Sequence, residues 1–225
     1  MDTRNQSAGR DPRMPAPPGL PPVLHADNRM LVFSKPPGLL SVPGIGPDKA
    51  DCLASRAEAE FPGARIVHRL DRDTSGVIVL ARDTEAHRML SIQFQDRKVE
   101  KRYEAVVGGE LAVDDGQIDA PMRKDLDDPP RQIIDAAQGR SAVTRFTVLE
   151  RKPDRTRVEL APVTGRSHQL RVNMLSIGHP ILGDDLYAPP DLLEAAPRLL
   201  LHATILTIAH PSTNEDVTFF DPCPF

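Results

Sequence analysis

The stretch that most restricts the fold is a charged loop enclosed by two apolar segments. Residues 66–81 read IVHRLDRDTSGVIVLA, with both apolar runs flanking the polar centre. Short apolar runs bounded by turn residues are typical of buried strands, so residues 65–70 and 77–81 are predicted to be strands, the second buried on both faces. A loop fixed at both ends to core strands holds its side chains on a rigid support. The pattern therefore predicts a buried sheet that carries a functional loop.

The other patterns predict many strands and few helices. Strands are expected in hairpins at 23–35 (around Asp27-Asn28) and 141–163 (around Pro153-Asp154), and singly at 101–109, 199–208 and 217–220, with weak strands at most in 110–140. Helices are expected at 48–61, after an Asp83-Thr84 cap and after a Ser167 cap. Adjacent strands with a few flanking helices indicate an α+β fold with a mixed, mostly antiparallel sheet.

Length and composition bound the organisation of the chain. Residues 1–21 include the Pro-rich run MPAPPGLPP and are expected to be disordered, and residues 22–225 are expected to form a single domain. There is no apolar run long enough to span a bilayer and no signal-peptide pattern. Two cysteines are too few for a disulfide scaffold and wrongly spaced for zinc. A cytoplasmic protein is the expectation.

The first candidate site is the charged loop itself. Asp71 is flanked by Arg69 and Arg72, and nearby positive charge favours an ionised carboxylate that can act as a nucleophile. The alternative is a tight turn whose ion pairs are solvated and contribute little. Spacing alone leaves both interpretations open.

The second candidate is TGRSHQLR, residues 164–171. Gly165, Arg166 and Ser167 precede a predicted helix, whose free backbone N–H groups favour an anion such as phosphate. Arg171 lies beside the apolar face of that helix, and a partly buried arginine needs an anionic partner. A capped surface helix with ordinary charges is the alternative.

The third candidate is RKVEKRY, residues 97–103. Lys98, Lys101 and Arg102 lie close to Tyr103, and basic residues beside an aromatic ring suit a single-stranded or flipped nucleotide. A solvated basic face is the alternative. The net charge of −4 means that any polyanion must be met by such a local patch. The histidines show no metal-ligand spacing, and no dinucleotide or P-loop motif is present, so neither metal nor cofactor is expected.

Taken in order, five stretches resemble the RluA-type RNA pseudouridine synthases. They are KPPGLLSVPG (35–44), HRLDRDTSGVIVLAR (68–82), KRYEAVVGG (101–109), TGRSHQLRVNMLSIGHPILGDDLY (164–187) and RLLLHATILTIAHP (198–211). The resemblance runs from about Val23 to the last residue. It implies the pseudouridine synthase fold with a central RNA-binding cleft, and an isomerase that breaks the N1–C1′ bond of a uridine and rejoins the base through C5.

The resemblance also implies roles for individual residues. Asp71 is the nucleophile, attacking either C1′ or C6, and Arg171 pairs with it. Tyr103 stacks on the target base and assists removal of the C5 proton, while Arg69 enters the space that the flipped nucleotide leaves. The residues expected to contact RNA are Arg69, Arg72, Arg166, His168, Lys98, Lys101 and Arg102, with the basic side chains and Arg65 facing one cleft.

Within that family the chain is similar to the short RluA branch, without an N-terminal S4 domain. The implied substrates are a uridine in a tRNA anticodon stem-loop, one in a 23S rRNA hairpin, or both, and a monomer is expected. Two alternatives differ in class. A base-releasing glycosidase would need a second carboxylate, for which Asp73 is the near candidate. A non-catalytic RNA-binding protein would keep the fold without the reaction.

Overall fold

The computed structural model describes residues 14–46 and 49–225. Its strands are β1 (Val23–Ala26), β2 (Met30–Lys35), β3 (Arg65–Ile66), β4 (Ser75–Ala81), β5 (Glu100–Gly108), β6 (Asp115–Asp119), β7 (Met122–Lys124), β8 (Gln132–Ile134), β9 (Val143–Lys152), β10 (Arg155–Pro162), β11 (Leu201–Ala209) and β12 (Asp216–Phe220). Its helices are α1 (Leu53–Glu60), α2 (Thr84–Gln95), α3 (Gln169–Ser176) and α4 (Pro190–Glu194).

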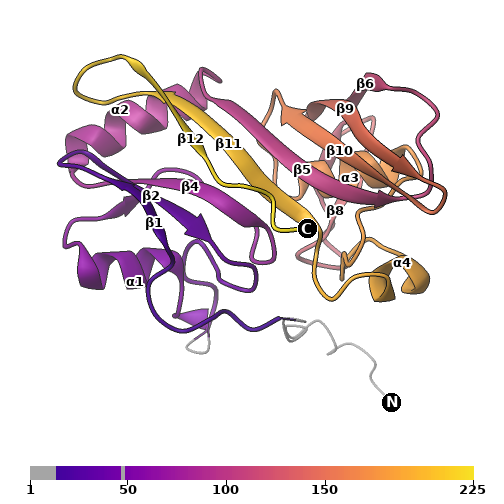
Figure 1. Ribbon diagram of the computed structural model, residues 1–225, viewed down its shortest axis with the longest axis horizontal. Helices are drawn as coiled ribbons and strands as arrows, with labels where there is room; N and C mark the ends of the chain where they lie inside the picture. Colours follow the sequence, from indigo (N-terminus) through magenta and orange to yellow (C-terminus); the bar gives the residue numbers. More distant parts are fainter. Residues whose placement is uncertain (1–13, 47–48) are drawn as a thin grey trace.

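One large mixed sheet runs across the molecule (Figure 1). Its ten strands follow the order β1-β2-β4-β11-β5-β10-β9-β6, with β12 added to β11 and β3 to β4, while β7 and β8 form a separate pair. The strands pair antiparallel except β11 with β4. The predicted α+β class with a mostly antiparallel sheet is confirmed.

Strand β4 forms the centre of one half of the molecule. All of its residues are buried, as its apolar sequence predicted. Because successive side chains of a strand point to opposite faces, Val77 and Val79 pack in the cluster that includes α2, whereas Ile78 and Leu80 pack in the cluster that includes α1. The two helices consequently lie on opposite sides of β2 and β4 (Figure 1).

Gly76 is required where the charged loop enters β4. Its φ of +112° lies in the region that favours glycine, and a Cβ there would come within 2.2 Å of the carbonyl oxygen of Ala203. Ala203 is the β11 residue that pairs with Gly76 in the parallel ladder. The last residue of the HRLDRDTSG motif therefore permits the close approach of the two central strands.

The other half of the core joins β5 and β10 to helix α3. Ala105 and Leu160, from neighbouring strands, share a cluster with Leu170 and Met174 of the helix. Tyr103 packs against this cluster and also against the cluster around β2 and α1. The ring therefore lies where the two halves of the core meet.

Three predicted elements differ in extent. The strand predicted at 65–70 ends at Ile66, and Leu70, at the end of that stretch, bonds through both backbone groups to the Ser41 side chain rather than to a strand. The helix predicted from residue 48 begins at Leu53, with Cys52 as its cap. The Ser167 cap is wrong: His168 occupies the cap position in the left-handed region, with φ of 54° and no side-chain cap bond.

Other local predictions are confirmed. The Asp83 side chain accepts a hydrogen bond from the Ala86 amide and caps α2. Strands β9 and β10 pair with Lys152 opposite Arg155, so their turn lies at Pro153-Asp154. Residues 110–140, predicted to hold weak strands at most, contain the short strands β6, β7 and β8.

The Pro-rich lead-in is only partly described, since residues 1–13 lie outside the described residues. The segment from residue 14 onward contacts the domain, in contrast to the disorder predicted for it. Arg56 of α1 donates hydrogen bonds of 2.7 Å to the carbonyl oxygens of Pro17 and Gly19, and Ala16 and Leu20 pack against the core cluster around Phe33. Among the described helices, none is long and apolar enough to cross a membrane.

Candidate active site

Asp71 lies in the irregular segment between β3 and β4, as predicted. Its side chain is 28% exposed, and a guanidinium nitrogen of Arg171 lies 3.9 Å from its Oδ2 atom. The Thr74 amide donates to the Asp71 carbonyl oxygen at 3.2 Å, closing a turn within the loop. The structure thus joins a loop from the first half of the fold to helix α3 of the second half, at a carboxylate that solvent and a substrate can reach.

Arg171 is held mainly by carboxylates that the sequence analysis did not assign. Its Nε donates to Oδ2 of Asp184 at 2.8 Å and its Nη2 to Oδ1 of the same residue at 2.5 Å, while Nη2 also donates to Asp185 at 3.1 Å. Arg171 is 3% exposed and Asp184 is fully buried. Burial opposes the charge of Arg171, but the bonds to Asp184 and the nearby carboxylates, including Asp71, raise its pKa. The arginine remains a fixed cation beside Asp71.

Asp185 connects the helix to the charged loop. One carboxylate oxygen accepts from Arg171, and the other lies 3.4 Å from Nη2 of Arg72. Arg72 also donates three bonds of 2.9 to 3.1 Å to the Asp73 carboxylate beside it. Asp73 is therefore occupied by Arg72, which leaves Asp71 as the carboxylate of this loop that faces Arg171.

Tyr103 lies in the same site. Burial raises the pKa of its phenol, and the negative charge of Asp71 raises it further. The hydroxyl therefore keeps its proton at physiological pH, and the site presents a neutral aromatic ring beside an acidic side chain. The sequence predicted that Asp71, Arg171 and Tyr103 come together, and the structure brings all three together.

Lys101 lies on the same face of β5 as Tyr103, because the two are separated by one residue. Its Nζ atom is 3.9 Å from the point where a Cβ on Gly165 would lie, and its charge helps to lower the pKa of His68. Burial lowers the pKa of Lys101 itself. Within the described part of the chain, no hydrogen bond or ion pair engages its ammonium group. The lysine lies between the loops that contain His68 and Gly165.

His68, the first residue of the charged motif, has a structural position. Burial, more than the Lys101 charge, lowers its pKa to about 3, so the ring is neutral. Its Nε2 accepts a bond from the Val79 amide at 3.2 Å, and the ring stacks on Phe94 with centroids 4.4 Å apart. The histidine therefore fixes the start of the loop to β4 and α2.

His168 also lies near the charged site, since the charges of Asp71, Arg171 and their partners all affect it. Burial is the main reason that its pKa is lowered. Its Nδ1 shares a 2.7 Å hydrogen bond with the Tyr187 hydroxyl, and the Tyr187 ring lies 5.1 Å below the guanidinium carbon of Arg171. Tyr187 also accepts a bond from the Gln132 amide of β8. The β7–β8 pair is thus connected to Arg171 through one buried ring.

The remaining basic residues do not share one cleft. Arg102 points to the face of β5 opposite Tyr103, where it bonds to Glu100 at 2.8 Å and Glu159 at 3.2 Å. The prediction that all the basic side chains line a single cleft is wrong for Arg102, because adjacent residues in a strand alternate between faces. Lys98 is exposed, 3.5 Å from Asp96, in the turn before β5.

Arg65, Arg69 and Arg166 lie in separate segments. Arg65 is exposed on β3 and Arg69 on the charged loop, and across the described residues no hydrogen bond or ion pair of Arg69 is found. Arg166 is half-buried, and its Nε lies 3.4 Å from the Ser141 carbonyl oxygen. Arg69 and Arg166 therefore come from the two loops on either side of Lys101.

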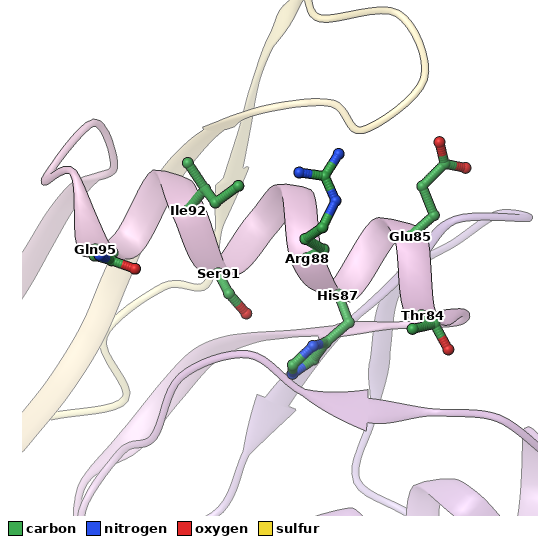
Figure 2. A pocket seen from close by; sticks show the side chains of 7 residues that line it. All are labelled: Thr84, Glu85, His87, Arg88, Ser91, Ile92 and Gln95. Atoms are coloured by element: carbon green, nitrogen blue, oxygen red, sulfur yellow. The ribbon is translucent and has the colours of Figure 1, made fainter.

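A separate hollow lies along helix α2 (Figure 2). It is lined by Thr84, Glu85, His87, Arg88, Ser91, Ile92 and Gln95, all of the one helix. His87 turns away from the exposed row of side chains and bonds to the Ile66 carbonyl oxygen at 3.0 Å, which attaches α2 to β3. None of the predicted site residues lies here. In the described ranges, no cluster of three His, Cys, Asp or Glu side chains could hold a metal ion.

The GDDLY stretch belongs to the family-like pattern of the sequence, but no role for its residues is predicted from sequence alone. Asp184, Asp185 and Tyr187 form the surroundings of Arg171, and they come from the segment after α3 rather than from the charged loop. The sequence does contain a signal for this arrangement. Two adjacent acidic residues and an aromatic residue follow shortly after the buried arginine. Lys35 and Ser41, in KPPGLLS, were likewise read only as part of a loop.

Comparisons with known proteins identify the family of this chain. Residues 29–176 match the family model described as RNA pseudouridylate synthase. The chain is 49% identical over 198 residues to the dual-specificity RNA pseudouridine synthase RluA of Haemophilus influenzae, covering 88% of this chain and 90% of that protein. The RluA protein of Escherichia coli is 46% identical over 204 residues, covering 90% and 93%.

A solved structure shows the same fold. The human RNA pseudouridylate synthase domain containing 1 superposes with a TM-score of 0.76 at 29% identity, covering 90% of this chain and 83% of that one. The family match and the RluA relatives define the class of this protein as an RNA-modifying isomerase. The chain belongs to the RNA pseudouridine synthase family, and among its relatives the RluA proteins match it over nearly their full length.

Proposed function

We propose that Asp71 is the nucleophile with which this enzyme isomerises uridine in RNA. The observation that carries the proposal is the position of its partly exposed carboxylate, 3.9 Å from a buried arginine and close to the Tyr103 ring. Asp71 forms a bond to the nucleotide, at C1′ or at C6, and the N1–C1′ bond breaks. The base then turns and joins C1′ through C5, and the bond between Asp71 and the nucleotide breaks, which returns the free carboxylate. The proton lost from C5 is balanced by one gained at N1.

The neighbouring residues supply orientation rather than further covalent chemistry. Arg171, fixed by Asp184, keeps positive charge beside the reacting carboxylate. Tyr103 provides a face for the base to stack on and, as a neutral phenol, an oxygen near the C5 proton. A base in a helix is not accessible to these groups, so the nucleotide is flipped out at a cost of about a few kcal/mol. Arg69 fills the space that the nucleotide leaves.

RNA phosphates are bound by the basic side chains nearest to Asp71. The arrangement supports Lys101, Arg69 and Arg166 as contacts, since they come from the segments around the site. Arg72 and His168 act mainly through the carboxylates and the ring that they already bond. Lys98 extends the contact surface at the beginning of β5. Such contacts make RNA binding dependent on salt.

We further propose that the substrates are a uridine in a tRNA anticodon stem-loop and one in a 23S rRNA hairpin. The relatives that match nearly the whole chain are named dual-specificity enzymes, which supports two RNA substrates. The enzyme acts as a monomer in the cytoplasm, with one catalytic domain over residues 22–225, and uses neither metal nor cofactor. Sedimentation analysis of the purified protein tests the monomer.

The test is a comparison of the wild type with Asp71→Asn on transcripts of the two stem-loops. We expect pseudouridine, read by carbodiimide-blocked primer extension, from the wild type and none from Asp71→Asn, with RNA affinity retained. Asp114→Asn, an exposed site whose side chain is 85% accessible, is the matched control and keeps full activity. Pseudouridine formed by Asp71→Asn would disprove the nucleophile.

The same experiment separates the two alternatives. A base-releasing glycosidase would produce free uracil and an abasic RNA. The bonds between Arg72 and Asp73 oppose this alternative, since Asp73 is not free to act as its second carboxylate. A protein that binds RNA without reacting would leave the transcripts unmodified by wild type as well.

A further inference from the structure

The backbone on each side of Asp71 is bonded to a buried side chain from another segment. That segment is residues 35–41, which leaves the end of β2 and has no part in the proposed chemistry. Strand β2 pairs with β4 along its length, with Lys35 opposite Gly76. Any side chain of this segment that bonds to the Asp71 loop therefore connects the loop to the rigid centre of the sheet.

Ser41 bonds to the residue before Asp71. Its hydroxyl donates to the Leu70 carbonyl oxygen at 2.7 Å, and it accepts from the Leu70 amide at 3.1 Å. Ser41 is 3% exposed. A single hydroxyl thus satisfies both backbone groups of Leu70, in a stretch where no strand partner does so.

Lys35 bonds to the residue after Asp71. Its ammonium donates to the carbonyl oxygens of Pro36 and Leu39 at 2.8 Å and of Arg72 at 2.9 Å. The three N–H groups of the ammonium are matched by three carbonyl oxygens, and the side chain is completely buried. A buried lysine is costly unless it is hydrogen-bonded, which these bonds provide.

Charged groups surround Lys35. Burial lowers its pKa to about 7, the carboxylates of Asp73 and Asp71 act against that change, and the cations Arg198 and Arg72 act with it. Burial beside the Asp71 loop therefore makes the Lys35 ammonium group easier to deprotonate. Three backbone acceptors, one of them adjacent to Asp71, explain its position.

We propose that Ser41 and Lys35 are positioning residues that hold the Asp71 carboxylate in its reacting position by fixing Leu70 and Arg72 on either side of it. The inference rests on Asp71 as the proposed nucleophile. It assigns a function to the KPPGLLS segment, whose side chains do not need to touch RNA. Misplacement of a reacting group by about 1 Å lowers the rate about 100-fold. Loss of one of these bonds is therefore expected to lower the reaction rate more than the RNA affinity.

The main test uses Ser41→Ala, with Ser212→Ala in the exposed turn after β11 as the matched control. The measurements are the single-turnover rate at saturating enzyme, the Kd for a stem-loop RNA, and the melting curve. We expect Ser41→Ala to lower the rate by about 10- to 100-fold without a comparable change in Kd. Ser41→Thr, which retains the hydroxyl, restores most of the rate, and Ser212→Ala behaves as the wild type.

A second test measures whether Ser41 acts through Asp71. Asp71→Glu moves the carboxylate by one methylene, so in that background Ser41→Ala has a smaller effect on rate than in the wild type, because residues that act as a unit are not additive. Lys35→Arg, a larger cation that cannot place three N–H groups in the same way, also slows the single-turnover reaction of the folded enzyme. It leaves the Kd unchanged.

The inference is overturned if Ser41→Ala reacts at the wild-type rate, if Ser41→Thr is as slow as Ser41→Ala, or if Kd weakens in proportion to the rate. If the Ser41→Ala protein fails to fold, Lys35→Arg decides. A folded Lys35→Arg enzyme that reacts at the wild-type rate then overturns the inference. An active Asp71→Asn enzyme would instead disprove Asp71 as the nucleophile. The experiments therefore distinguish failure of the proposed nucleophile from failure of the proposed positioning residues.

Discussion

Two arginines of this protein each bond to two carboxylates, but in opposite surroundings. Arg171 is 3% exposed and bonds to the fully buried Asp184 and to Asp185. Arg102 is 44% exposed on the other face of the sheet, where it bonds to Glu100 and Glu159. Exposed ion pairs contribute little because water and salt compete with them. The buried pair has no such competition, so it fixes a charge in place.

The comparison shows how the enzyme separates its charges. On the Tyr103 side of β5, a cation is fixed beside Asp71, and Lys101 is left without a partner in the described part of the chain. On the other side, Arg102 is neutralised by glutamates of its own and a neighbouring strand. An acidic protein can thus present positive charge at one place, without a basic surface as a whole.

The largest expected effect is that of Asp184→Asn. This change removes the buried carboxylate that accepts two of the bonds of Arg171, so we expect the free energy of unfolding to fall by about 3–5 kcal/mol and the activity to be lost. Urea denaturation measures the first and primer extension the second. Glu159→Gln, the matched change at the exposed pair, alters stability by about 0.5 kcal/mol or less. Equal losses of unfolding free energy in Asp184→Asn and Glu159→Gln would mean that burial does not make the ion pair of Arg171 stronger than that of Arg102.

The next effect concerns the ring between the two halves of the core. Tyr103→Phe keeps the stacking face and removes the oxygen, so we expect the single-turnover rate to fall about 100-fold or more with RNA affinity preserved. Because burial and Asp71 raise the pKa of Tyr103, the wild-type rate shows no tyrosine ionisation between about pH 6 and about pH 9. A fully active Tyr103→Phe enzyme would show that Tyr103 contributes only a stacking face and that its hydroxyl is not needed.

A smaller effect distinguishes the two neighbouring cations of β5. Lys101→Met removes the cation on the Tyr103 face of β5. We expect the Kd for the stem-loop to rise about 10-fold and the slope of log K against log salt to fall by about 1. Arg102→Met, on the opposite face, leaves both quantities close to those of the wild type. Filter binding at several salt concentrations measures them. If Arg102→Met weakens binding as much, RNA also reaches the outer face.

The smallest effect is the pH dependence of that contact. Burial lowers the pKa of Lys101, so the protonated form, which binds phosphate, is present below the lowered value and is lost as pH rises through it. We expect RNA affinity to weaken with rising pH at a lower pH in the wild type than in Lys101→Arg, whose guanidinium stays charged. If RNA affinity depends on pH in the same way in the wild type and in Lys101→Arg, Lys101 stays charged over the pH range and the prediction is wrong.

The parts of the site that could be predicted were those with a local pattern. The two apolar runs predicted where Asp71 lies, because their spacing and turn residues are local properties. The strand-like alternation near Tyr103 predicted β5, and the buried side of a helix predicted that Arg171 needs a carboxylate. The same reasoning could not name Asp184 as that carboxylate, since any acidic residue of the chain was a candidate until the segments were packed.

By itself, the sequence determined the order of the strands and helices, the buried character of β4, and a charged loop that carries Asp71. These follow from periodicity, turn chemistry and composition, which act over a few residues. Only the tertiary structure decided which face each cation occupies, which carboxylates fix Arg171, and that Lys35 and Ser41 bond on either side of Asp71. Those relations join residues far apart in the chain, and their energies depend on burial, which exists only once the segments have packed together.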